Sequence, residues 1–111
     1  MPSEASARAF SDILEHALLA QSFVDGMTFE AFSADRRTFH AVTRCLEIIS
    51  EASRRLEEDA RARHPNLPWK AIMGGGNVYR HNYDNVAEAF VWRTVQDRLG
   101  EMIAVARAEI G

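Results

Sequence analysis

The pattern of apolar and polar positions along the chain is helical over most of its length. In the N-terminal segment the apolar side chains recur at spacings of three and four, which is the period of a helix with one face on a core. These positions are Phe10, Ile13, Leu14, Ala17 and Leu18. Ser3 is placed to cap the start of this helix, and Asp25-Gly26 marks its end. No run alternates with period two for long enough to predict a strand, so the pattern predicts an all-α protein.

A second long helix follows a short one. Thr28 is predicted to cap the short helix and Ser33 the long helix behind it. The long helix should end before Pro65, because the residue that precedes a proline avoids helical angles. The apolar face of this helix comprises Phe39, Val42, Cys45, Leu46, Ile49, Ala52 and Leu56.

The last segment, from about Asp84 to Ile110, is predicted to be one helix. Its apolar face comprises Val91, Val95, Leu99, Met102, Ala106 and Ile110. Gly100 lies inside it and costs about 1 kcal/mol relative to alanine, which suggests close packing against a neighbour. Residues 64–76 form the main loop, with a short helix from Trp69 to about Met73. The elements together predict an antiparallel bundle of about four to five helices, three of them long.

Composition narrows the class of protein. The chain has 111 residues, of which 47% are apolar, so residues 1–111 are expected to form a single domain with its own core. The formal net charge of −3 argues against non-specific binding to nucleic acid, and no DNA partner is expected, although a local cationic pocket remains possible. No segment has the roughly 18 consecutive apolar residues of a membrane span. The single cysteine, Cys45, fits a reducing compartment, and we expect a cytoplasmic protein.

One segment gathers polar chemistry beside three consecutive glycines. It reads MGGGNVYRHNYDNV and runs from Met73 to Val86. It is neither a Walker loop, which needs a following Gly-Lys-Ser/Thr, nor a Rossmann fingerprint, which needs a preceding strand. The glycines alone are most simply a hinge between two helices.

The polar residues after the glycines could cleave RNA. Asn77 and His81 are four residues apart and share a face if both are helical, and Arg80 could reach the same ligand. RNA cleavage needs a group that deprotonates the ribose 2′-hydroxyl and a cation for the developing charge on phosphorus. Imidazole and guanidinium supply these two functions. An alternative is an exposed polar helix start, with Tyr83 packed against the bundle.

A metal site has little support in the sequence. The four histidines, His16, His40, His64 and His81, fall in four different segments, and no zinc-binding spacing is present. Glu47 and Glu51 of the long helix are four residues apart, but Arg44, Arg54 and Arg55 around them indicate a solvent-exposed face with salt bridges. We therefore expect no metal and no cofactor.

Three stretches together resemble the HepT-like toxins of the HEPN superfamily. They read FSADRRTFHAVTRCLEIISEASRRL, PWKAIMGGGNVYRHNYDNV and VWRTVQDRL, and they cover nearly the whole chain. The array Asn-x-x-x-His-x-Tyr lies between a Trp-led short helix and a Val-Trp helix, and the collective spacing of the matches is far more specific than any one of them. The matching residues are Asp35, Glu51, Ala52, Trp69, Asn77, His81, Tyr83, Val91 and Trp92.

The resemblance implies an α-helical homodimer whose two motif copies face each other across the interface. It implies a metal-independent endoribonuclease toxin of a toxin–antitoxin system, with RNA as substrate. Its implied partner is a minimal nucleotidyltransferase antitoxin that adenylylates the tyrosine. By this resemblance His81 is the acid/base, Asn77 its polar support, Arg80 a phosphate clamp and Tyr83 the modification target.

One departure from the family pattern keeps alternatives open. The superfamily motif places an arginine directly before the asparagine, and Gly76 stands there in this chain, with Arg80 directly before the histidine. The chain could therefore be a catalytically weak or inactive scaffold that binds a nucleotidyltransferase partner or a nucleotide. A helical dimer with a purely structural role is a third possibility.

Overall fold

A computed structural model shows an all-helical chain, as the sequence predicts. It describes residues 2–81 and 85–111, with the backbone alone for residues 76–81, 85 and 86. Seven helices lie in this described part rather than the expected four to five. They are α1 (Glu4–Phe23), α2 (Phe29–Ala34), α3 (Arg36–Arg55), α4 (Glu58–Ala62), α5 (Trp69–His81), α6 (Asn85–Asp97) and α7 (Leu99–Ile110).

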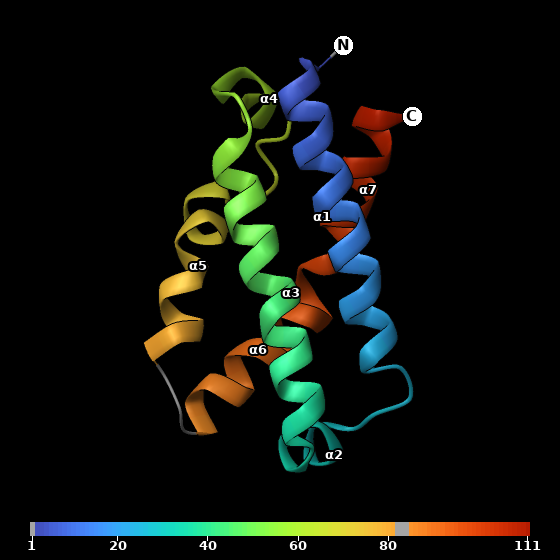
Figure 1. The fold of residues 1–111 in the computed structure, drawn as a ribbon, viewed down its shortest axis with the longest axis vertical. Coiled ribbons are helices and arrows are strands. Elements are labelled where there is room, and N and C mark those ends of the chain that lie inside the picture. Colours follow the sequence, from blue (N-terminus) through green and yellow to red (C-terminus); the bar gives the residue numbers. More distant parts are fainter. Residues whose placement is uncertain (1, 82–84) are drawn as a thin grey trace.

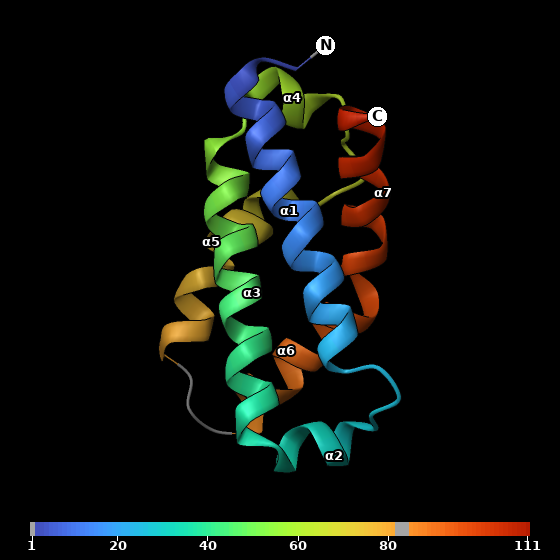
Figure 2. The ribbon, with the colours of Figure 1, turned by 45° about the vertical axis from the view of Figure 1, so that its right-hand side comes forward.

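The long helices run up and down beside one another (Figure 1). Helix α1 packs against α3 on one side and α7 on the other, and α5 packs against the opposite side of α3. Helices α4 and α2 lie at opposite ends of the bundle, and the start of α1 and the end of α7 both lie near α4 (Figure 2). In the described part, no helix is both long and apolar enough to cross a membrane.

Local capping sets the starts of the first helices. The Ser3 hydroxyl accepts a hydrogen bond from the Ser6 amide and that of Thr28 accepts one from the Ala31 amide, which confirms both predicted caps. The prediction for Ser33 is wrong, because Asp35 caps α3. Its carboxylate accepts bonds from both the amide and the hydroxyl of Thr38, at 3.1 and 2.8 Å, and these bonds lower the pKa of Asp35.

The core is built from the predicted apolar faces of α1 and α3. Phe10 and three alanines of α1 are fully buried, and small side chains let neighbouring helices approach closely. All seven predicted apolar positions of α3 and its C-cap are buried. Leu18 departs from the prediction, since it is 39% exposed.

The predicted C-terminal helix is two helices, with a bend at Arg98. The bend has a packing reason: α6 contacts α2 and α3, whereas α7 packs along α1, and one straight helix could not reach both. Close packing does not explain Gly100, because a Cβ there would meet nothing within 4 Å. The glycine lies in the first turn of α7, directly after the bend.

The glycine triplet is also not a hinge. Helix α5 runs unbroken from Trp69 through the glycines to His81, where the sequence predicts a helix ending near Met73. The preceding loop is fixed by a buried Leu67 and by the Trp69 indole, which donates to the His64 carbonyl at 2.9 Å. Helix α3 ends at Arg55, ten residues before Pro65, and the short α4 fills part of the gap.

Candidate functional site

The predicted catalytic residues lie on the last two turns of α5. Asn77 and His81 are four residues apart in one continuous helix, so their backbone positions share one side of it, and Arg80 follows about 100° around. The structure thus places all three on a single rigid element. Tyr83, the predicted modification target, lies outside the described residues.

A pair of side chains on α3 holds α5 one turn before the motif. The Met73 carbonyl accepts hydrogen bonds from the Ser50 hydroxyl at 2.9 Å and the Arg54 guanidinium at 2.6 Å. Arg54 also donates to the Ser50 hydroxyl at 3.1 Å, which closes a triangle of bonds. Because the carbonyl of residue 73 faces the amide of Asn77 in a helix, this contact fixes the turn from which the motif begins. We call Ser50, Arg54 and the Met73 carbonyl the α5 clamp.

A second contact holds the start of α6, on the other side of the motif. The Glu88 carboxylate is buried and accepts hydrogen bonds from the Ser33 hydroxyl at 2.5 Å and the Arg36 guanidinium at 3.1 Å. A carboxylate in the first turn of a helix also interacts favourably with the helix dipole. Helix α5, which carries the motif, and helix α6, which follows it, are therefore both fixed to the α2–α3 segment by charged hydrogen bonds.

Sequence reasoning missed both contacts. Arg54 and Arg55 were predicted to pair with nearby glutamates on the solvent-exposed face of α3. Instead Arg54 donates to the Met73 carbonyl as part of the α5 clamp, and Arg55 pairs with Asp12 of α1 at 2.8 Å. The four-residue spacing of Ser50 and Arg54 was a possible signal, since it puts a hydroxyl and a cation on one side of α3.

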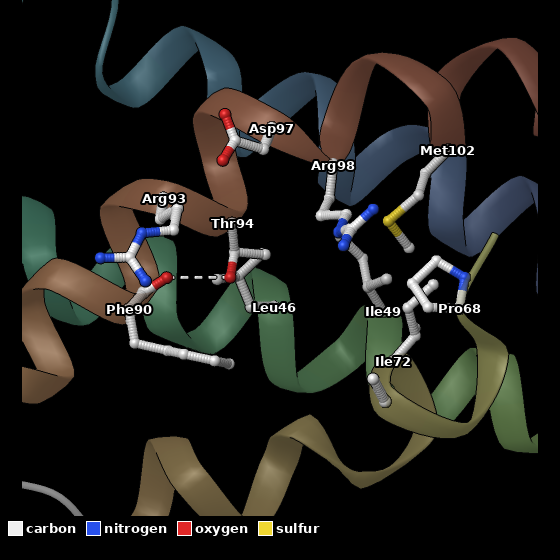
Figure 3. Close-up of a pocket in the computed structure, with 11 residues that line it drawn as sticks. Leu46, Ile49, Pro68, Ile72, Phe90, Arg93, Thr94, Asp97, Arg98 and Met102 are labelled. Carbon is white, nitrogen blue, oxygen red and sulfur yellow. Dashed lines mark hydrogen bonds between the residues drawn. The ribbon is translucent and has the colours of Figure 1, made fainter.

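A cavity of about 220 Å³ lies where α3, α5, α6 and α7 meet (Figure 3). Its floor is apolar and includes the buried side chains of Leu46, Ile49 and Met102. Arg93 and Arg98 stand at its rim and are exposed. No local sequence pattern predicts this cavity, because its walls come from four helices.

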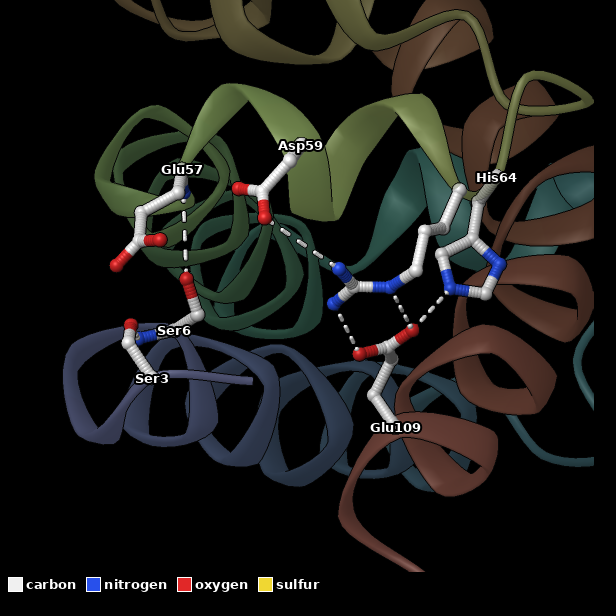
Figure 4. A network of polar contacts seen from close by, with 7 residues as sticks. Ser3, Ser6, Glu57, Asp59, His64 and Glu109 are labelled. Atoms are coloured by element: carbon white, nitrogen blue, oxygen red, sulfur yellow. Dashed lines mark hydrogen bonds and ion pairs between the residues drawn. The ribbon is translucent and has the colours of Figure 1, made fainter. Parts of the chain in front are cut away.

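A polar network lies at the α4 end of the bundle (Figure 4), away from the C-terminal end of α5 that carries the motif (Figure 1). The Glu109 carboxylate accepts two hydrogen bonds from Arg63, at 3.1 and 2.7 Å, and lies 2.6 Å from His64 Nε2. Arg63 and then His64 lower the pKa of Glu109 to about 2. This network fastens the loop after α4 to α7, and its role is structural.

The remaining groups are the single cysteine and the possible metal ligands. Cys45 is buried in α3, as expected, and burial raises the pKa of its thiol. Among the described side chains, no three His, Cys, Asp or Glu residues form a group that could hold a metal ion.

Fold and motif define an all-helical protein with a histidine–arginine motif at the end of an anchored helix. The family described as Ribonuclease HepT-like matches residues 13–109, and the chain belongs to this family. The resemblance found in the sequence is thereby confirmed.

Related proteins carry ribonuclease names. The chain is 35% identical to "Putative RNase MJ1380" of Methanocaldococcus jannaschii over 96 residues, which cover 86% of this chain and 88% of that protein. It is 36% identical to "Probable ribonuclease HepT" of Thermococcus cleftensis over 86 residues, 78% of each chain. It is also 36% identical to "Putative RNase TTE0752" of Caldanaerobacter subterraneus subsp. tengcongensis, over 80% of this chain and 83% of that protein. No solved structure matches the chain significantly.

Proposed function

We propose that this protein is a metal-independent endoribonuclease whose reacting groups are His81 and Arg80. The observation that carries the proposal is the placement of both residues, with Asn77, on the final turns of a helix that the α5 clamp holds against α3. Membership in a ribonuclease family supports RNA as the substrate.

The proposed reaction is an attack by the ribose on its own phosphate. His81 takes the proton of the 2′-hydroxyl, the 2′-oxygen bonds to phosphorus, and the bond to the 5′-oxygen breaks. Arg80 binds the phosphate oxygens and stabilises the added negative charge, and Asn77 supports the imidazole. The leaving oxygen takes a proton from the imidazolium of a second motif copy, which leaves a 2′,3′-cyclic phosphate and a 5′-hydroxyl.

The second motif copy would come from a homodimer. A composite site at the two-fold axis doubles the local positive charge, which would let a chain with a net charge of −3 hold an RNA backbone locally. We further propose that the protein is the toxin of a toxin–antitoxin pair. A minimal nucleotidyltransferase would neutralise it by adenylylating Tyr83, because a nucleotide there would stand two residues from His81.

The test is cleavage of RNA in the presence of EDTA. We expect the native chain to cleave and His81→Ala to lose at least 100-fold in rate, since general acid–base catalysis contributes about 10²–10⁴-fold. The control is His16→Gln on α1, whose imidazole bonds the Asp12 carbonyl of its own helix; this variant should cleave normally. Absence of cleavage by a folded native dimer over a panel of RNAs would refute the proposal.

A second candidate is a catalytically weak scaffold that binds a nucleotidyltransferase or a nucleotide. Gly76 favours it, because the superfamily arginine belongs at that position. The backbone of Gly76 is helical, a conformation that arginine adopts readily. If Gly76→Arg creates a cleavage activity that the native chain lacks, the scaffold reading is correct.

A further inference from the structure

The cavity between α5 and α6 has the size and lining of a site for one flat ring system. An apolar cavity of about 150 Å³ accepts benzene, so a space of about 220 Å³ accepts a nucleobase. Its floor residues Leu46, Ile49 and Met102 are each at most 3% exposed, and the ring of Phe90 lies beside them (Figure 3). Such a surface binds the face of a base without regard to its hydrogen-bonding edge.

The rim of the cavity suits a phosphate. The guanidinium groups of Arg93 and Arg98 make no hydrogen bond or ion pair with any described residue, and both are exposed. Asp97 is the one carboxylate among the lining residues, and in Figure 3 it lies on the side away from Ile72 and Pro68. The apolar floor matches the base of a nucleotide, and the two arginines at the rim match its phosphate.

The cavity is held at a fixed distance from the motif. Ile72 lines it and lies nine residues before His81 on the same unbroken helix, a rise of about 13 Å. At about 3.4 Å per stacked nucleotide, this distance corresponds to about four nucleotides of one strand. A base in the cavity and a scissile phosphate at the motif could therefore belong to one single-stranded RNA.

We propose that this cavity is a nucleobase subsite for the RNA substrate, with Arg93 and Arg98 on the adjoining phosphate; the inference rests on the proposed ribonuclease function. An unpaired base leaves the stack of the RNA and enters the cavity. Proteins that bind single-stranded RNA with little sequence preference hold bases in the same way. The site selects single-stranded over duplex RNA, because a paired base cannot enter.

The test uses a 2′-O-methyl oligoribonucleotide, which binds but cannot react because its 2′-oxygens are blocked. Its affinity is measured by fluorescence anisotropy while one nucleotide after another is replaced by an abasic unit. We expect one position at which loss of the base weakens binding to the native chain about tenfold. A native chain with no such position overturns the subsite.

Two variants locate the base in the cavity. Ala71→Trp fills it from its exposed edge, and we expect the intact oligonucleotide to bind about tenfold more weakly and the abasic position to lose its effect. Arg98→Gln should reduce the salt dependence of binding by about one phosphate contact. Ala104→Trp and Arg107→Gln, at exposed sites of α7 outside the lining, are the matched controls and should bind as the native chain does.

Other outcomes are equally decisive. Unchanged affinity in both cavity variants overturns the inference, and so does a loss of dimer mass in Ala71→Trp by light scattering, which would show that a second copy covers the cavity. Cleavage of ordinary RNA by the native chain is measured in parallel. Cleavage without a sensitive abasic position overturns the subsite alone, and a sensitive position without cleavage overturns the nuclease alone.

Discussion

The α5 clamp makes a prediction that separates stability from positioning. Arg54→Ala removes the hydrogen bonds of a charged donor to the Met73 carbonyl and to Ser50. Because Arg54 is exposed, we take the low end of the usual range and expect a loss of about 1–2 kcal/mol in unfolding free energy. Domains of this size are stable by about 5–15 kcal/mol, so the variant stays folded.

Activity should fall by more than this loss of stability can explain. The clamp fixes the turn that carries Asn77, and a displacement of about 1 Å in a catalytic group can cost about 100-fold in rate. We expect RNA cleavage by Arg54→Ala to fall at least tenfold at a temperature where the protein is fully folded. Amide hydrogen exchange in residues 74–81 should also become faster, a readout that does not depend on catalysis.

The neighbouring arginine is the matched control. Arg55→Ala removes an ion pair with Asp12 whose partners are both nearly half exposed, which contributes about 0–1 kcal/mol. Cleavage and exchange in residues 74–81 should be unchanged in this variant. If Arg54→Ala and Arg55→Ala behave alike in exchange and activity, the clamp does not position the motif.

Three further predictions concern the body of the fold. The folded pKa of Glu109, about 2, lies below its ordinary value of 4.5, so its contribution to stability is full above about pH 4.5 and is lost as the pH falls towards 2. Glu109→Gln should lower the unfolding free energy by about 1–2 kcal/mol at neutral pH and weaken its dependence on pH below about 4.5. An equally steep loss of stability in acid would contradict this. The buried Cys45 thiol, with its raised pKa, should resist alkylation in the native protein and react only after unfolding, as quantitative labelling by mass spectrometry would show. Phe10→Ala should cost about 3–5 kcal/mol in denaturant unfolding, because the residue is fully buried. Phe23→Ala, at a residue that is 39% exposed, should cost far less, and equal losses would refute the packing argument.

Helix existence and the core faces could be predicted because they depend on local spacing. The caps at Ser3 and Thr28 were predictable for the same reason, since each bonds an amide three residues away. The cap of α3 could not be predicted in this way, because both Ser33 and Asp35 are good capping residues. Their roles are decided by a partner distant in sequence: Ser33 donates to Glu88, and Asp35 is left to cap.

The two largest errors have a shared physical origin. Three glycines favour a hinge by propensity, but bonds from Ser50 and Arg54 to the adjacent Met73 carbonyl hold that segment as helix. The C-terminal segment keeps one helical period through Arg98, so no local signal marks the bend between α6 and α7. Tertiary contacts overrode local preference in both places.

The candidate site could be predicted only in part, for the same reason. The positions of Asn77, Arg80 and His81 on one helix could be predicted from the resemblance and from their spacing. The residues that hold this helix, and the cavity beside it, could not, because each depends on side chains from separate helices. Sequence alone therefore supplied the proposed reacting groups and missed the residues that hold their helix in place.

The two attachments on α3 imply a constraint on its length. Arg36, which holds α6, and Arg54, which holds α5, are 18 residues apart on this helix. At 3.6 residues per turn this is five whole turns, so the two arginines project from the same side, about 27 Å apart. Inserting or deleting one residue between them would rotate one arginine by about 100° relative to the other and detach one flank of the motif. Homologous chains that keep both arginines should therefore keep the number of residues between them unchanged, even where the amino acids themselves vary.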